Sequence, residues 1–416
     1  MFKKIRDSIY GFISIDQQEQ EIVDHFAFQR LRRIKQLSLT DMVYPGATHT
    51  RFEHSLGVMQ MATEMYDCIV SNPANKNLLE DEYALSDAGR QRYRKIVRLA
   101  ALLHDLGHPP FSHAGEDLMP LLPNTHANYK KGEGKRFEHE AYSIEIIKRY
   151  FKDIIERHPV NSNYEIKVEE VTALLGDGAV KTNAMSLLWK TLISGQLDAD
   201  RADYLLRDSL HIGVNYGLYD RERLVHSLTI GRLETGSLTI GIEEKSWHIA
   251  ESLVLARYQM FSQVYFHKVR RIYDYHIYKA TKEVLTALGQ KKGCYPPPDK
   301  LEEYLKFSDW SIYAEMLQGH GGTHGDIVLN RNHYICIDKT GIPPSVEDDK
   351  KFKSLKSKYT GADFYIDEKA AHTSWYKLDK DIPICGKSAT VPLSQKSRII
   401  ESMLENPRQK RFYVAR

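Results

Sequence analysis

The sequence predicts a mainly α-helical fold with a small β-hairpin and a C-terminal α+β region. Apolar residues recur at helical spacing through most of the first 288 residues, and one stretch near residue 236 alternates as a hairpin does. Beyond residue 289, short β-prone pieces alternate with charged segments. We therefore expect two parts, residues 1–288 and 289–416, with the Gly- and Pro-containing stretch GQKKGCYPPPDK at their boundary.

Composition narrows the class of protein. The 416 residues are 42% hydrophobic and 27% charged, as in an ordinary globular chain. The 58 basic and 55 acidic residues give a net charge of +3, so no overall bias marks a nucleic-acid or membrane-surface protein. The four cysteines contain no C-x-x-C pair, and no stretch approaches the roughly 18 apolar residues that span a bilayer. We expect a cytoplasmic protein with no membrane contact.

The helices expected in the first part follow from apolar periodicity and from its interruptions. Ile22, Phe26 and Leu31 share one face of the first segment, and Pro45 and Gly46 separate it from the next. SNPANKNLLEDEYALSDAG is expected to be a polar connection. The expected helices cover residues 17–37, 51–70, 90–105, 139–157, 168–175, 183–212 and 249–285.

The remaining segments are expected to be loops and strands. Residues 114–138 are rich in Gly, Pro, Asn and Lys, which predicts a long loop that could serve as a lid. The hairpin is expected in LTIGRLETGSLTIGI. Strands of the C-terminal region are expected in HYICI, ADFYI and RFYVA.

The stretch ALLHDLGHPPFSH concentrates residues that can bind a metal. His104 offers a neutral nitrogen and Asp105 a hard oxygen, a mixed pair that suits a transition metal better than calcium. A His-Asp pair alone also occurs by chance. The metal-site interpretation is better supported because two further residues that can bind a metal, His54 and Asp200, also lie in expected helical segments.

A stripe of polar residues follows Asp200. Asp200, Tyr204 and Asp208 recur at i, i+4 and i+8, which places two carboxylates and a phenol on one helix face. Such a stripe would be costly to bury unless it faced a metal, a cation or a polar ligand. A solvated acidic face is the alternative for Asp198, Asp203 and Asp208 taken singly.

The motifs RFEHSLGV, LLHDLGHPPFSH and DADRADYLLRD, in this order, resemble those of the HD-domain phosphohydrolases. They are most similar to the deoxynucleoside triphosphate (dNTP) triphosphohydrolases, the branch that includes the vertebrate enzyme with a sterile alpha motif. The resemblance runs from about residue 10 to residue 272. It implies that residues 1–288 form a helical HD-domain core and that residues 289–416 are regulatory or oligomerising.

The resemblance also implies a metal site and a reaction. His54, His104, Asp105 and Asp200 would bind one divalent ion, which could be Mn, Fe, Zn, Ni, Co or Mg. Water would attack the α-phosphorus of a dNTP, releasing the deoxynucleoside and intact triphosphate.

Three further residues match the acid/base group of the family. They are His113, Glu116 and His139, with His113 preferred as the proton donor to the leaving sugar oxygen. Glu116 stands where the vertebrate enzyme has aspartate. For Glu116 and His139 a plain surface position is the competing interpretation.

Substrate and regulatory positions are implied in the same way. The arginines could contact phosphates, Tyr204 could stack under the sugar and Asp208 could accept a sugar hydroxyl. The substrate positions are Gln36, Leu37, Arg51, His108, Arg201, Tyr204, Asp208, Arg257 and Tyr265. Asp24, Arg30 and Arg32 match a segment that binds a regulatory nucleotide, although a solvated helix face explains this basic segment equally well. The family also implies a homo-oligomer, either a dimer or a tetramer.

Two other functions remain open. One is an HD phosphohydrolase that acts on a monophosphate, a cyclic nucleotide or a signalling nucleotide. The other is a nucleotide or nucleic-acid sensor that uses the basic segments KSLKSKY and ENPRQKRFYVAR, although these fit solvated charge runs better.

Overall fold

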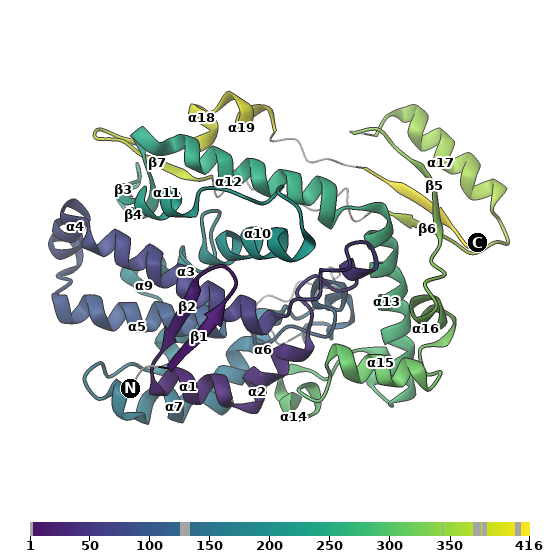
Figure 1. Ribbon diagram of the computed structural model, residues 1–416, viewed down its shortest axis with the longest axis horizontal. Coiled ribbons are helices and arrows are strands. Elements are labelled where there is room, and N and C mark those ends of the chain that lie inside the picture. The colour runs from purple at the N-terminus through teal and green to yellow at the C-terminus, as the bar shows by residue number, and fades with distance from the viewer. Residues whose placement is uncertain (1–2, 125–133, 343, 369–375, 377–380, 404–408) are drawn as a thin grey trace.

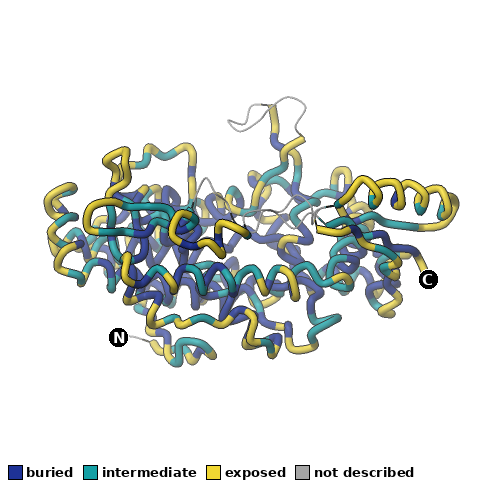
Figure 2. The backbone as a smooth tube through the Cα atoms, turned by 90° about the horizontal axis from the view of Figure 1, so that it is seen from above, coloured by how far each residue is buried: buried dark blue, intermediate teal, exposed yellow. Residues whose placement is uncertain are grey.

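A computed structural model describes residues 3–124, 134–342, 344–368, 376, 381–403 and 409–416. Three helices form its centre: α3 (Arg51–Ser71) packs against both α5 (Asp87–Leu103) and α10 (Ala199–Ile212). The mainly helical fold with its small sheets confirms the expected class (Figure 1). Figure 2 shows buried residues gathered through the middle of the molecule and exposed ones on its outer turns.

The first expected helix, over residues 17–37, is broken. It consists of α1 (Gln17–Asp24), α2 (Phe26–Gln29) and a 3-10 turn (Arg30–Arg33). His25 is extended, with φ −71° and ψ 142°, and its Nδ1 accepts the N–H of Ala27. This cap restarts the helix in a new direction, which the apolar periodicity alone does not reveal.

The connection expected over residues 71–89 also contains a helix, α4 (Pro73–Tyr83). Asn72 caps its first turn, Pro73 occupies the first helical position and Ala84 ends it in a left-handed conformation. The Asn-Pro pair is a helix-start signal, so this helix could have been recognised.

Three of the longer expected helices are interrupted. Residues 139–157 form α6 (His139–Ile146), a π-helical turn and α7 (Lys152–Arg157), and residues 183–212 divide into α9 (Ala184–Lys190) and α10. Asp198 starts α10 by accepting the N–H of Arg201 at 2.8 Å. The expected helix 249–285 is α12 (Trp247–Met260), a π-helical turn (Phe261–Tyr265) and α13 (Lys268–Ala287).

The hairpin is confirmed, and the structure adds strands to it. β3 (Leu228–Arg232) and β4 (Leu238–Glu243) are antiparallel, and β4 pairs in parallel with β7 (Pro383–Cys385), which in turn pairs with β8 (Thr390–Pro392). An N-terminal hairpin of β1 (Lys3–Asp7) and β2 (Gly11–Ile15) was not expected.

The C-terminal strands are also confirmed as a three-stranded sheet. Its order is β5 (Ile335–Lys339), β9 (Arg411–Val414) and β6 (Phe364–Asp367), and α17 (Val346–Lys358) covers one face with Phe352 against Phe412. The remaining helices are α8 (Val168–Leu174), α11 (Arg221–His226), α14 (Leu301–Tyr304), α15 (Asp309–Leu317), α16 (Gly322–Leu329), α18 (Leu393–Lys396) and α19 (Arg398–Ser402).

Tyr295, Tyr304 and Phe307 belong to the same apolar core as the central helices. The boundary at 288/289 stays a prediction.

Among the described helices, none has the length and apolar character needed to cross a bilayer.

Two histidines join α13 to α16. His276 is fully buried, and its Nε2 accepts the N–H of Tyr334 at 3.3 Å, so its other nitrogen, Nδ1, carries the proton that is donated to His324 Nδ1 at 2.9 Å. Burial, together with the neighbouring His324 and His333, lowers the pKa of His276 to about 3. A second proton on His276 would break the contact with Tyr334.

This pair predicts acid sensitivity of folding. Because the pKa of His276 is below its usual value of 6.5, its contribution to stability is complete above pH 6.5 and is lost as the pH falls toward 3. Chemical denaturation from pH 7.5 to 4 should show a slope in the unfolding free energy of up to about 1.4 kcal/mol per pH unit from this group. His276→Gln should flatten that slope, whereas His320→Gln, at a half-exposed histidine, should leave it unchanged.

Candidate metal centre and catalytic site

The four expected metal ligands come together from three elements. His54 lies in the first turn of α3, His104 and Asp105 lie at the end of α5, and Asp200 lies in the first turn of α10. The packing of these helices therefore brings residues 54 and 200 to the same point. A short-range sequence pattern could not have shown this.

The geometry fits a bound ion. His54 Nε2 lies 3.1 Å from Asp200 Oδ1 and 3.7 Å from Asp105 Oδ2, and His104 Nε2 lies 3.2 Å from Asp105 Oδ1. The Nε2 atoms of His54 and His104 are buried and lack a hydrogen-bond partner among the described residues. Ligand atoms of His54, His104 and Asp105 all lie within 4.8 Å of one another. Two imidazole nitrogens and two carboxylates suit a divalent transition metal.

The other nitrogen of each histidine is held in place. His104 Nδ1 donates to the carbonyl oxygen of Ala101 at 2.8 Å, and His54 Nδ1 donates to Asp203 at 2.8 Å. Both Nε2 lone pairs are thus directed to the cluster. Burial alone would lower the pKa of His54, but Asp200 and Asp203 raise it to about 10, because the surrounding carboxylates favour a cation, either a proton or a metal ion, at Nε2.

Asp203 is itself part of a buried chain of charges. Arg207 donates to both of its oxygens at 2.9 Å and to Asp7 of β1 at 3.0 Å. Burial favours the protonated acid, yet Arg207 and His54 lower the pKa of Asp203 to about 2. The solvated-face alternative is therefore wrong for Asp203, which is fully buried. A Cβ at Gly57 of α3 would overlap both Asp203 and Arg207, so this helix needs glycine there.

Arg51, which was expected to bind a substrate phosphate, is buried and already hydrogen-bonded within the protein. Only 2% exposed, it donates through Nη1 to Asp105 and through Nε to Ser112 Oγ at 2.8 Å. Burial would raise the pKa of Asp105, but Arg51, together with His104 and His108, holds it well below its usual range. Arg51 therefore orients a metal ligand in this structure.

The expected acid/base residues form a second cluster beside the first. Glu116 lies 2.8 Å from His139 Nδ1 and 3.1 Å from His113 Nδ1. The rings of His108 and His139 are stacked, with centroids 3.6 Å apart, and His108 Nε2 lies 3.3 Å from Asp105. The side chain of His113 is 67% exposed and can reach a substrate from solvent. Glu116 and His139 are thus not plain surface residues.

The pKa values in this cluster reflect both burial and charge. Burial opposes ionisation of Glu116, but His113 and His139 hold its pKa well below the usual value. Burial would lower the pKa of His139, yet Glu140 and Glu116 raise it to about 9. His108 has a strongly lowered pKa because it is buried and lies near Arg51 and His139. The two stacked rings therefore have pKa values shifted in opposite directions.

Several residues expected to bind substrate lie in α10, in α12 and in the π-helical turn after α12. Arg201 donates to Asp198 and to the carbonyl of Gly195, and Arg257 donates to Gln196 at 3.0 Å. Tyr204 and Tyr265 meet edge to face, with centroids 6.3 Å apart. Leu37 is buried and Gln36 is partly exposed.

Asp208 has partners that the sequence reading missed. His49 Nε2 donates to one of its oxygens at 2.8 Å and Tyr265 donates to the other at 2.5 Å. Tyr265 lies in the π-helical turn after α12, a distortion frequent at functional sites. His49 occurs in GATHTRFEH, five residues before His54, and this proximity was an available signal.

The three residues expected to bind a regulatory nucleotide are not equivalent. Arg30 is 1% exposed and donates to the carbonyl oxygens of Phe307 and His108 at 2.8 and 2.9 Å. Arg32 lies on the surface over the ring of Phe52, and Asp24 is exposed. The described structure thus gives Arg30 an internal bridging position, while a regulatory role for the other two stays a prediction. Residues 125–133 of the expected lid lie outside the described residues.

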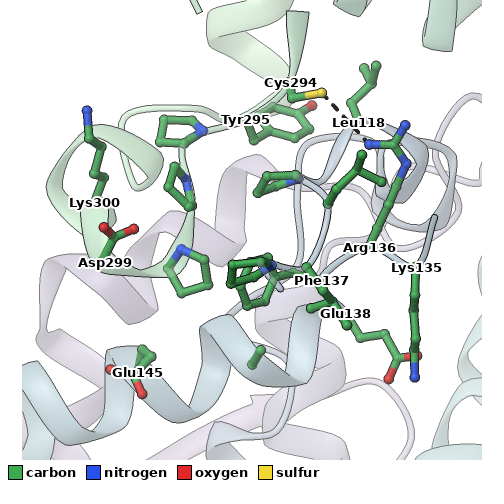
Figure 3. Close-up of a pocket in the computed structure, with 18 of the residues that line it drawn as sticks. Leu118, Lys135, Arg136, Phe137, Glu138, Glu145, Cys294, Tyr295, Asp299 and Lys300 are labelled. Atoms are coloured by element: carbon green, nitrogen blue, oxygen red, sulfur yellow. Dashed lines mark hydrogen bonds and ion pairs between the residues drawn. The ribbon is translucent and has the colours of Figure 1, made fainter. Parts of the chain in front are cut away.

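A large groove is lined in part by residues of α6, among them Glu145 (Figure 3). Its volume is about 1640 Å³, and Leu118, Lys135, Phe137 and Tyr295 are among its lining residues. None of the described residues expected to bind metal or substrate lines it. The groove is separate from the metal cluster.

Comparison with known proteins identifies the family. Residues 51–208 match the HD domain and residues 219–295 match the HD-associated region. This chain is 37% identical to an uncharacterized protein of Methanocaldococcus jannaschii, in an alignment that covers 68% of this chain. It is 30% identical to the deoxynucleoside triphosphate triphosphohydrolase SAMHD1 homolog of Dictyostelium discoideum, over 74% of this chain. It is also 30% identical to the deoxynucleoside triphosphate triphosphohydrolase SAMHD1 of Homo sapiens, over 76% of this chain. It spans 50%, 53% and 50% of these relatives, about half of their length.

Solved structures agree over the whole chain. A hypothetical protein of Aquifex aeolicus has a TM-score of 0.75 and 26% identity, covering 100% of this chain and 97% of that one. A phosphohydrolase of Bacteroides thetaiotaomicron has a TM-score of 0.73 and 25% identity, covering 100% of both. All four expected metal ligands lie inside the segment that matches the HD domain. The chain belongs to the HD-domain superfamily and is similar to the deoxynucleoside triphosphate triphosphohydrolases.

Proposed function

We propose that this protein is a metal-dependent phosphohydrolase that converts a dNTP and water into a deoxynucleoside and inorganic triphosphate. The observation that carries the proposal is the pair of buried, unpartnered Nε2 atoms of His54 and His104 beside Asp105 and Asp200, within the described residues. A divalent ion held there would polarise a phosphate oxygen and lower the pKa of a water molecule. Its identity among Mn, Fe, Zn, Ni, Co and Mg stays open.

The residues beside the cluster supply the proton chemistry. Water adds to the α-phosphorus, the bond from phosphorus to the sugar 5′ oxygen breaks, and that oxygen takes a proton. His113 is the proposed donor because its side chain is exposed and its Nδ1 is oriented by Glu116 at 3.1 Å. Glu116 also binds His139, so one carboxylate orients two imidazoles.

The substrate class follows from the surrounding side chains and the relatives. Arg201 and Arg257 supply positive charge for a triphosphate, and Tyr204 offers an aromatic face for a sugar. Relatives at 30% identity are named as dNTP triphosphohydrolases. We carry that substrate to this chain as part of the proposal, together with a homo-oligomeric state, a regulatory nucleotide and the cytoplasmic location.

The products test the proposed reaction. Incubation with each dNTP and Mn²⁺ should release deoxynucleoside and intact triphosphate in equal amounts, as measured by ion-exchange chromatography. Pyrophosphate or orthophosphate as the first product would contradict this reaction and favour another HD phosphohydrolase. Metal-independent, salt-sensitive binding of single-stranded DNA without turnover would instead favour the sensor.

Variants of the two clusters should behave differently. His104→Ala and Asp105→Ala should lose both bound metal and turnover, because each removes a ligand. His113→Ala should keep its metal and lose about 10²- to 10⁴-fold in kcat, the usual contribution of general acid catalysis. Metal analysis together with single-turnover kinetics checks this. Equal metal loss in all three variants would contradict the assigned roles.

Asp203 should affect metal affinity by holding the His54 ring in place. Asp203→Asn removes the carboxylate that fixes the His54 ring, so metal affinity should fall about 10- to 100-fold. Metal titration of the apoprotein measures this. Asp177→Asn, at a buried carboxylate elsewhere in the fold, is the matched control, and the same weakening in both variants would refute a specific role.

A further inference from the structure

The turn that carries His113 has a strained backbone. Phe111 and Ser112 are consecutive residues with side chains, and both have positive φ, 61° and 54°. Residues other than glycine seldom adopt this left-handed conformation. Two in succession persist only where the surrounding structure holds them, and such strain clusters at functional sites.

Asp309, the first residue of α15, holds this turn. It is 1% exposed, and its Oδ1 accepts the N–H of Phe111 at 2.7 Å. Its Oδ2 accepts the N–H of Lys35 at 2.9 Å. One carboxylate from the C-terminal part thus joins two segments that lie 198 and 274 residues earlier in the chain.

Both segments belong to the proposed active site. Lys35 directly precedes Gln36 and Leu37, and the strained turn directly precedes His113. The two segments are also joined to each other, because Ser112 Oγ donates to the carbonyl oxygen of Lys35 at 2.7 Å. The same hydroxyl accepts from Arg51, which is bonded to the metal ligand Asp105. Displacement of the turn would therefore move His113 and loosen its connection to the Lys35 segment.

A carboxylate suits this position better than its neutral isostere does. Ionised aspartate has two acceptor oxygens and no donor, whereas asparagine would turn an NH₂ group toward one of the two backbone N–H groups. Keeping the charge buried is unfavourable: burial raises the pKa of Asp309 to about 6, although two backbone N–H groups and the nearby Lys35 and Arg30 counteract it.

We propose that Asp309 is a positioning residue for the hydrolysis, which holds the His113 turn and the Gln36-Leu37 segment in register. The inference rests on the proposed function and deepens it, because it assigns to α15 a part in shaping the site. Asp309 does not touch the reacting atoms. It acts through the backbone of Phe111 and Lys35.

Asp309→Asn tests the proposal. The value of kcat for a dNTP should fall about 10- to 100-fold, since small misplacements of a catalytic group have effects of this size. Metal content should stay the same, because the variant keeps all four expected ligands. KM should change less than kcat, because the substrate side chains themselves are kept. Hydrogen exchange should become faster in peptides covering residues 34–37 and 109–113.

Asp177→Asn is again the matched control. Asp177 is buried, accepts the N–H of Ala179 at 3.1 Å and pairs with Lys148 at 2.6 Å, but it does not contact the turn. It should leave both kcat and exchange at 109–113 unchanged. Equal losses in the two variants, or unchanged exchange at 109–113 in Asp309→Asn, would overturn the proposal.

Asp309→Glu serves as a second variant in case the asparagine form does not fold. It keeps the charge and both acceptor oxygens. Its kcat and its protection from hydrogen exchange should therefore fall less than those of Asp309→Asn. If Asp309→Asn does not fold, Asp309→Glu should still fold. A larger loss than in Asp309→Asn would contradict the proposal. If the wild-type protein releases no triphosphate, the proposed function fails, whereas the exchange measurements still decide whether Asp309 holds the turn.

Discussion

The site depends on a row of buried charges that begins at the first strand. Asp7 binds Arg207, Arg207 binds Asp203, and Asp203 binds His54. Removing one member would leave an unpaired charge in the interior, which is strongly unfavourable. The row fixes α10 against α3, and it leaves the Nε2 atom of His54 facing the other ligands. Structural and chemical roles are therefore joined in the same side chains.

Around this row, several polar residues of the two clusters are oriented by a neighbour. The carbonyl of Ala101 fixes His104, Arg51 fixes Asp105, and Glu116 fixes His113 and His139. Sites whose geometry is set by neighbouring hydrogen bonds need little rearrangement during a reaction. The HD-domain match covers the central helices, yet β1 supplies Asp7 to the row of buried charges and α15 supplies Asp309 to the His113 turn.

The sequence predicted local features well and long-range ones poorly. Periodicity identified α3, α5 and the β3-β4 hairpin, and the motif resemblance selected the four residues that meet in the metal cluster. It did not reveal the break at His25, the parallel pairing of β7 with β4, or the burial of Asp203, since each depends on tertiary contacts. Arg30 illustrates the limit, because a basic residue in an amphipathic segment is here fully enclosed.

The distance in sequence between Lys35 and Asp309 has a consequence for biosynthesis. The ribosome completes the three central helices long before residue 309 leaves the exit tunnel. At about 5–20 residues per second, the nascent chain waits for some tens of seconds without the contact that orders its strained turn. The residues of the candidate metal cluster can thus come together first during translation, while the ordered His113 turn has to await the synthesis of residue 309.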